Sequence, residues 1–120
     1  MLHHELLRDE GILLIRPQGP IQAGDFESIA KSVDPYIEDK GRLLGVMIEA
    51  HSFPGWDSFA ALVSHLRFVR DHHRLIGKVA AVSDSAMLSI APQIAKHFVK
   101  AEVRHFSENE REAALAWLRE

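Results

Sequence analysis

The chain has 120 residues, 47% of them hydrophobic and 26% charged, which is enough for one domain with a single core. Its formal net charge of -3 argues against nonspecific nucleic-acid binding, which requires a basic surface. It has no cysteine, which excludes disulfides and thiolate metal sites, and no apolar run approaches the roughly 20 residues that span a bilayer. Residues 1–10 lack the pattern of a signal peptide, so we expect a cytoplasmic location.

The first predicted elements are a β-hairpin and a helix. Residues 4–8 and 12–16 form two short strands, and residues 9–11 supply the turn between them. Apolar residues then recur at the spacing of one helix face, which predicts a helix over residues 23–39 that ends at Gly41. The positions on this face are Phe26, Ile29, Ala30, Val33 and Ile37.

A buried strand and a second helix follow. Residues 43–49 are apolar on both faces, as in a strand that is covered on two sides. The next helix begins with a cap at Asp57 or Ser58 and runs to about His72. Its helical spacing is carried by Phe59, Leu62, Val63, Leu66 and Val69.

The last part of the chain repeats the alternation of strand and helix. Residues 78–83 form a second buried strand, and Asp84 or Ser85 caps a third helix that Pro92 bends or splits. Residues 102–106 form the last strand. Residues 107–110 have the spacing of a capping box, which starts a final helix carrying Ala114, Leu115, Trp117 and Leu118.

These elements predict an α/β fold of order β-β-α-β-α-β-α-β-α in one domain, residues 1–120. Strands that alternate with helices need crossover connections, so the sheet is mostly parallel, with the first strand antiparallel at an edge. Right-handed crossovers pack helices against both faces of this sheet.

The segment from residue 51 to residue 59 is the main candidate for ligand or partner contact. It follows a buried strand and places Phe53 and Trp56 in a loop around Pro54 and Gly55, where polar residues are more usual. These aromatics, together with Phe59, either fold back onto the core or form the rim or lid of an apolar pocket. A wedge that enters a lipid headgroup region is a further alternative.

The order of elements, together with five segments, resembles the STAS fold and more closely its SpoIIAA-like branch of small bacterial proteins. The segments are Asp34–Ile37, Phe53–Trp56, Lys78–Asp84, Ala101–Phe106 and Ala113–Leu118. The resemblance covers nearly the whole chain and implies a non-catalytic module.

The resemblance also implies two kinds of partner. Anti-sigma antagonists of this superfamily bind a kinase and are switched by phosphorylation of a serine at the start of a helix. Asp57 and Ser58 match that motif, whereas Phe59 and Ala60 replace its small Ser-Gly pair with a bulky ring. SpoIIAA-like proteins are instead associated with apolar ligands or membranes, which the aromatic loop favours.

Other candidate sites are weaker. Glu49 and Asp84 follow neighbouring strands and would be the acid pair of a small enzyme, whereas Asp84 and Ser85 are also a plain helix cap. The eight histidines lack metal-binding spacing, and no phosphate loop or nucleophile elbow occurs, so we expect no metal, cofactor or catalysis. Three arginines, Arg67, Arg70 and Arg74, form a basic stripe that suits solvent, anionic lipid or an acidic partner.

The sequence therefore predicts a small cytoplasmic binding module. It would contact an apolar molecule or a membrane surface through Phe53, Pro54, Trp56 and Phe59. The alternative is a regulatory protein-interaction module switched at Ser58, with Asp57, Asp84 and Ser85 beside it. Exposed apolar residues are also compatible with a homodimer.

Overall fold

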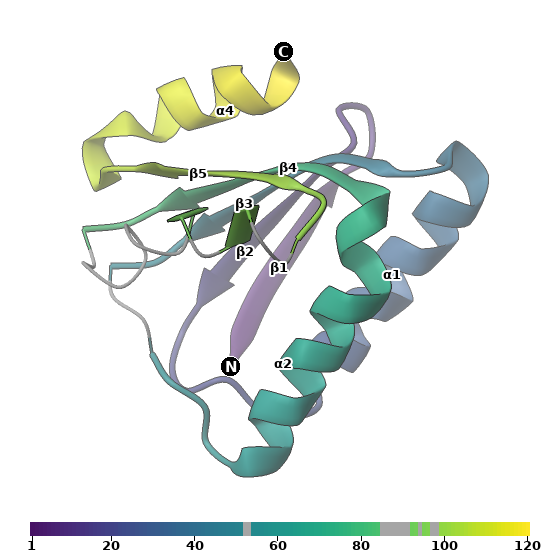
Figure 1. The fold of residues 1–120 in the computed structure, drawn as a ribbon, viewed down its shortest axis with the longest axis vertical. Helices are drawn as coiled ribbons and strands as arrows, with labels where there is room; N and C mark the ends of the chain where they lie inside the picture. Colours follow the sequence, from purple (N-terminus) through teal and green to yellow (C-terminus); the bar gives the residue numbers. More distant parts are fainter. Residues whose placement is uncertain (52–53, 85–91, 94, 97–98) are drawn as a thin grey trace.

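A computed structural model describes residues 1–51, 54–84, 92–93, 95–96 and 99–120. Five strands form one sheet in the order β1-β2-β3-β4-β5, with α1 and α2 on one face and α4 on the other (Figure 1). The strands are β1 (Leu2–Leu7), β2 (Ile12–Pro17), β3 (Leu43–Glu49), β4 (Ile76–Val82) and β5 (Glu102–Phe106). The helices are α1 (Asp25–Lys40), α2 (Phe59–His72), η1 (His73–Leu75), η2 (Glu108–Glu110) and α4 (Arg111–Arg119).

The pairing of the strands confirms the predicted mixed sheet. β1 pairs antiparallel with β2 at one edge, and every other pairing is parallel. The first strand spans residues 2–7 rather than 4–8, because its pairing with β2 extends from Leu2 opposite Pro17 to Leu7 opposite Ile12. The hairpin turn closes with the Gly11 amide donating to the Leu7 carbonyl oxygen, and Gly11 takes the positive φ of 70° that favours glycine there.

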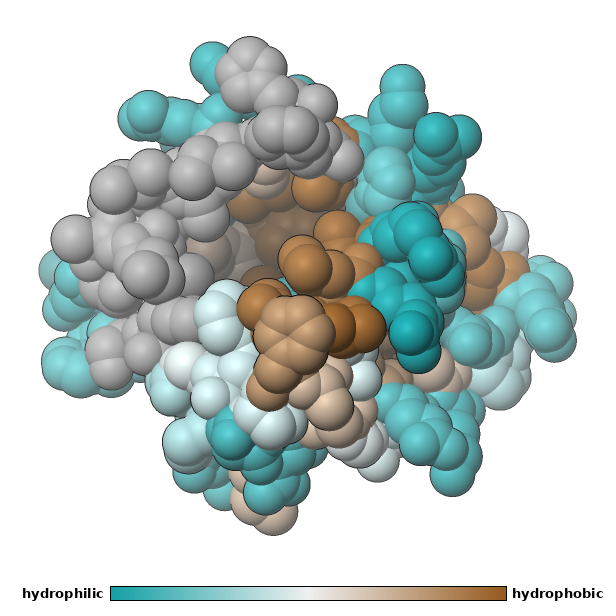
Figure 2. All heavy atoms as spheres, turned by 60° about the horizontal axis from the view of Figure 1, so that its bottom comes forward, coloured by the Kyte–Doolittle hydropathy of each residue, from teal (hydrophilic) through white to brown (hydrophobic). Residues whose placement is uncertain are grey.

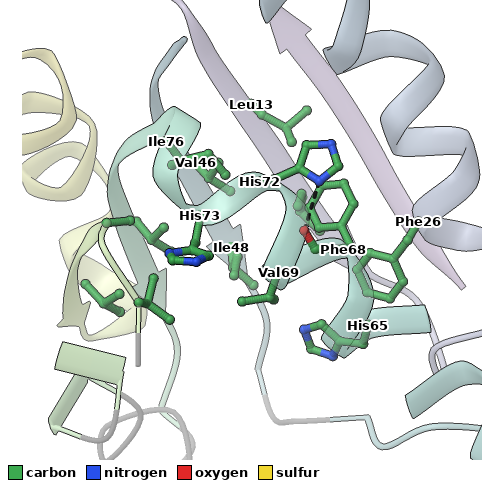
Figure 3. A pocket seen from close by; sticks show the side chains of 15 residues that line it. Leu13, Phe26, Val46, Ile48, His65, Phe68, Val69, His72, His73 and Ile76 are labelled. Carbon is green, nitrogen blue, oxygen red and sulfur yellow. Dashed lines mark hydrogen bonds between the residues drawn. The ribbon is translucent and has the colours of Figure 1, made fainter. Parts of the chain in front are cut away.

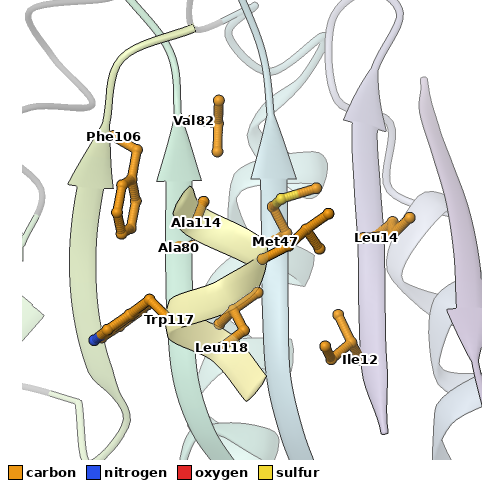
Figure 4. Packing of buried hydrophobic residues seen from close by; sticks show 10 residues of the cluster. Ile12, Leu14, Met47, Ala80, Val82, Phe106, Ala114, Trp117 and Leu118 are labelled. Atoms are coloured by element: carbon orange, nitrogen blue, oxygen red, sulfur yellow. The ribbon is translucent and has the colours of Figure 1, made fainter. Parts of the chain in front are cut away.

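Each face of the sheet has its own apolar core. On the α4 face, Leu118 and Ala114 are fully buried over Met47 and Ala80 (Figure 4). On the other face, the predicted stripe of α1 is buried against β2 and β3. The helix continues through Pro35 and ends where the Gly41 amide donates to the Ile37 carbonyl oxygen. The predicted third helix falls largely outside the described residues, although residues 92–93 and 95–96 are helical.

Helix α2 turns a different face to the protein than its apolar spacing predicts. The predicted stripe is largely outside the core, since Phe59 is 78% and Leu66 is 60% exposed. The inward face carries Ala61, His65, Phe68 and His72, spaced by four, three and four residues. The alternative in which Phe59 folds back onto the core is therefore wrong, because His65 and His72 take the inward positions through ring stacking, which a hydrophobicity pattern does not count as apolar. The contact of Phe59 with a ligand or a membrane stays a prediction.

The capping box that starts the last helical segment is present as predicted. The Ser107 hydroxyl and the Glu110 carboxylate lie 2.9 Å apart, and the Ser107 amide donates to the same carboxylate oxygen. Substitution of Ser107 by alanine is expected to lower the unfolding free energy by about 1 kcal/mol, because amides of the first turn lose their acceptor. Urea unfolding followed by circular dichroism checks this, and Ser107→Thr, which keeps a hydroxyl, should lose much less.

Candidate functional site

An apolar cavity of about 180 Å³, here called the main cavity, lies between α2 and the sheet. Figure 2 shows apolar side chains gathered around a hollow on this side of the molecule. All fourteen residues of α2 are described, and only Ala61 and His72 among them are buried, so the helix stands off the sheet. The floor of the main cavity is formed by Leu13, Ile15, Val46, Ile48, Val79 and Val103.

A second apolar cavity of about 110 Å³, the side cavity, adjoins the first. Both are lined by Ile15, Phe26, Ile48 and His65, so these side chains form the wall between them. Pro54, from the predicted contact loop, lines the side cavity. The loop therefore borders the apolar interior, although the main cavity itself lies on the face of the sheet rather than at the carboxyl ends of its strands.

Stacked aromatic rings form one wall of the main cavity, and Figure 3 shows them from α1 and α2. Phe26 of α1 stacks on His65 of α2, with ring centroids 4.8 Å apart. Phe68 lies 5.3 Å from Phe26 and 4.0 Å from His72. The rings follow one another in the order His65, Phe26, Phe68 and His72, so an imidazole stands at each end of an otherwise apolar wall.

His72 is held at both of its ring nitrogens. Nε2 lies 2.7 Å from the Asp34 carboxylate. Nδ1 lies 2.9 Å from the Phe68 carbonyl oxygen, the bond drawn as a dashed line in Figure 3. Both partners are acceptors, so a ring that bonds to both donates from both nitrogens. His72 thereby ties the end of α2 to α1.

His65, in contrast to His72, accepts a hydrogen bond at one of its ring nitrogens. The Trp56 indole nitrogen donates to Nδ1 of His65 over 3.1 Å, so this nitrogen carries no proton. Burial lowers the pKa of His65 below its ordinary value of 6.5, because the charged ring is desolvated among apolar side chains. The hydrogen bond and the burial both favour the neutral ring.

The low pKa of His65 predicts a pH-dependent stability. The unfolded chain binds a proton at His65 more readily than the folded protein does, so the unfolding free energy should fall as the pH drops below 6.5 and through the folded pKa. Above pH 6.5 this contribution is fully present. Thermal unfolding between pH 8 and pH 5 checks this. His65→Gln should flatten part of the slope, and an unchanged slope would contradict the assignment.

The described part of the predicted contact loop is pinned by its backbone. The Ile21 amide donates to the Gly55 carbonyl oxygen over 2.8 Å, and the Asp57 amide donates to the Ile21 carbonyl oxygen over 2.9 Å. Trp56 is 38% exposed and donates a hydrogen bond to His65, whereas Phe59 projects into solvent. Phe53 lies outside the described residues.

The predicted polar residues lie around the same loop and at the strand ends. Ser58 is exposed and caps α2, with its hydroxyl accepting from the Ala61 amide over 3.1 Å, and Asp57 beside it is exposed. Asp84 accepts from the Glu108 amide over 3.4 Å. Ser85 lies outside the described residues.

The carboxyl ends of the strands carry charged side chains that are paired with one another. Glu49 accepts from Arg16 over 3.3 Å and from Arg111 over 2.9 Å. His51 lies 2.7 Å from Glu108. Glu49 and Asp84, considered above as an acid pair, are thus held by different partners. Within the described residues, no three histidine, aspartate or glutamate side chains are grouped to hold a metal.

Sequence reasoning missed the inward-facing residues of α2 and their partners. The spacing of Ala61, His65, Phe68 and His72 was visible as a helical stripe, but two of the four are histidines. Their partners are far along the chain, since Asp34 lies 38 residues before His72. No local pattern links residues so far apart.

Comparisons with known proteins agree with this fold. A crystal structure of an uncharacterized protein from the DUF3478 family with a SpoIIAA-like fold, from Shewanella loihica PV-4, superposes with a TM-score of 0.75 at 20% sequence identity. The match covers 98% of this chain and 92% of that one. A search of curated proteins finds no sequence match.

The family assignment comes from the sequence. STAS-type folds are generally small non-enzymatic modules. In the described segments, every helix is too short or too polar to cross a bilayer. A profile of the SpoIIAA-like family matches residues 12–119, so the chain belongs to the SpoIIAA-like family.

Proposed function

We propose that this protein is a binding module that takes an apolar molecule into the main cavity beneath α2. The observation that carries the proposal is an apolar space of about 180 Å³ inside a small domain. An engineered protein cavity of roughly 150 Å³ with similar walls stays dry and binds benzene or xenon. A space of this size therefore suits a single ring or a short hydrocarbon chain.

The aromatic loop extends this site to the surface. Pro54 lines the side cavity, and Trp56 is bonded to His65 in the wall between the two cavities. Phe59 stands outside, 78% exposed, on the same helix that covers the main cavity. An apolar ligand that is dissolved and one that is drawn from a bilayer share the same chemistry, so separate experiments must distinguish the two sources.

Filling the main cavity should abolish binding of a dissolved ligand. Val69 of α2 lines this cavity and is half-buried, so a phenyl ring in its place occupies the space that a ligand needs (Figure 3). We expect benzene to shift the methyl NMR signals of the wild type and to leave Val69→Phe unaffected. Val63→Phe is the matched control, because Val63 is half-buried on the same helix but does not line this cavity. Equal binding by both variants would contradict the proposal.

Contact with a membrane depends on the exposed apolar side chain rather than on the cavity. Sedimentation with vesicles of neutral and anionic phospholipid should be lower for Phe59→Ser than for the wild type. The change should leave the unfolding free energy within about 0.5 kcal/mol, because Phe59 is mostly in solvent. If the wild type stays in the supernatant with both vesicle types while benzene still binds, the ligand is taken from solution.

A regulatory interaction module switched at Ser58 is the second candidate. Ser58 is exposed, and the first turn of α2 has no acidic residue, so a phosphate there would meet an unneutralised helix N-terminus. Intact-mass measurement and peptide mapping of protein isolated from growing cells test this. A phosphorylated peptide containing Ser58 supports the switch, and its absence under all growth conditions counts against it.

A further inference from the structure

The contact between Trp56 and His65 joins the surface loop to the wall of the main cavity. The indole N–H can only donate, so the 3.1 Å bond requires an unprotonated Nδ1 on His65. A proton on Nδ1 would set two N–H groups against each other. The bond therefore exists only while His65 is neutral, with its single ring proton on Nε2.

We propose that His65 is a proton-sensitive latch for the main cavity: the neutral ring holds the Trp56 indole by a hydrogen bond to the cavity wall, and protonation breaks this bond and weakens ligand binding. The inference rests on the proposed function, since it concerns regulation of that same site. His65 is placed for this role because it lines both cavities and stacks on Phe26.

The described residues around His65 include no acidic side chain that lines either cavity. Phe26 faces it from α1, and Trp56 faces it from the loop. Among the described residues that line the two cavities, the titratable side chains besides His65 are His72 and His73, and none is a carboxylate, lysine or arginine. The groove between α1 and α2, on the other side of the aromatic wall, carries the charged side chains Glu27, Asp34, Arg67 and Asp71. Among the described residues, an imidazolium at His65 is thus desolvated with no carboxylate in the cavity walls, in keeping with its lowered pKa.

The other two histidines respond differently to acid. His72 faces acceptors at both nitrogens, so a proton on either nitrogen meets an acceptor. His73 accepts from the Lys100 amide through Nδ1 over 2.9 Å, so its protonation would break a bond at a separate point of the rim. A His73 variant must therefore accompany any test of His65.

Two measurements on the full chain test the latch. The first follows the Trp56 indole N–H signal by NMR across the pH range, assigned with Trp56→Phe, together with the ring signals of His65. We expect the two to titrate with one midpoint, because breaking the hydrogen bond moves the indole proton into a new environment. An indole signal that does not follow His65 overturns the latch.

The second measurement is the affinity for benzene as a function of pH. If only the neutral form binds, the apparent Kd should rise about tenfold for each pH unit below the pKa of His65. His65→Gln, which keeps a side-chain acceptor but gains no proton, should bind with no such dependence, whereas His73→Gln should retain it. A pH dependence that persists in His65→Gln overturns the latch. Benzene binding that is absent at every pH overturns the proposed function instead.

Discussion

Replacement of Leu118 by alanine is expected to lower the unfolding free energy by about 2–5 kcal/mol. Leu118 is fully buried on α4, and a β-carbon on Gly45 of the central strand β3 would lie 2.7 Å from its Cδ2 atom. The side chain fills the space that the glycine leaves open (Figure 4). Truncation leaves a cavity that this close approach of helix and strand cannot easily close. For a domain whose total stability is about 5–15 kcal/mol, this is a large fraction.

Urea unfolding followed by circular dichroism measures the loss. Ala116 is the control, because it is exposed on the same helix and Ala116→Ser should change the unfolding free energy by less than about 0.5 kcal/mol. A loss below about 1 kcal/mol for Leu118→Ala would mean that α4 is not packed on the sheet as described.

Gly45 offers a second check of the same contact. Gly45→Ala alone forces the new methyl group against Leu118 and should cost about 1–3 kcal/mol. In the double variant the methyl group enters the space that Leu118 has vacated. The stability losses of Gly45→Ala and Leu118→Ala should therefore sum to more than the loss of the variant that carries both changes. A double-mutant cycle measures this coupling directly.

The parts of this fold that follow from local patterns were predictable. Strand β3 is apolar on both faces because helices cover both sides of the sheet, and the stripe on α4 is buried as its spacing indicates. The capping box at Ser107 is read from four consecutive residues. These signals are local, so the order of elements and the antiparallel edge strand could be inferred without a structure.

The site depends on contacts between residues of different elements, which local sequence patterns do not show. The helical spacing of Phe59 was compatible with burial in the core, yet the face of α2 that carries His65 and His72 turns inward. These rings are buried through stacking on Phe26 and Phe68 and through the bond to Asp34, all of which come from other turns or from α1. The cavity itself results from the distance between α2 and the sheet. That distance depends on how many side chains pack together, so no single position in the sequence indicates it.

Replacement of Phe26 by alanine is expected to change both stability and ligand size. Phe26 is 7% exposed and packs on His65 and Phe68, so its loss should lower the unfolding free energy by about 3–5 kcal/mol. Because its ring lines both cavities, the same change should join them into one space. We therefore expect Phe26→Ala to bind naphthalene better than benzene, the reverse of the wild type.

NMR titrations with the two hydrocarbons, together with urea unfolding, test this expectation. Leu118→Ala is the matched control, since it loses comparable stability on the opposite face of the sheet and should keep the preference for benzene. Phe26→Leu retains part of the wall and gives a folded variant of intermediate preference if the alanine variant does not fold. If Phe26→Leu leaves the preference unchanged while Phe26→Ala favours benzene as the wild type does, the wall does not set ligand size. Weaker binding of both hydrocarbons by Leu118→Ala would show how much affinity is lost through lower stability alone. A reversed preference in Phe26→Ala cannot arise in that way, because only a local change in cavity shape alters the choice between two ligands of the same chemistry.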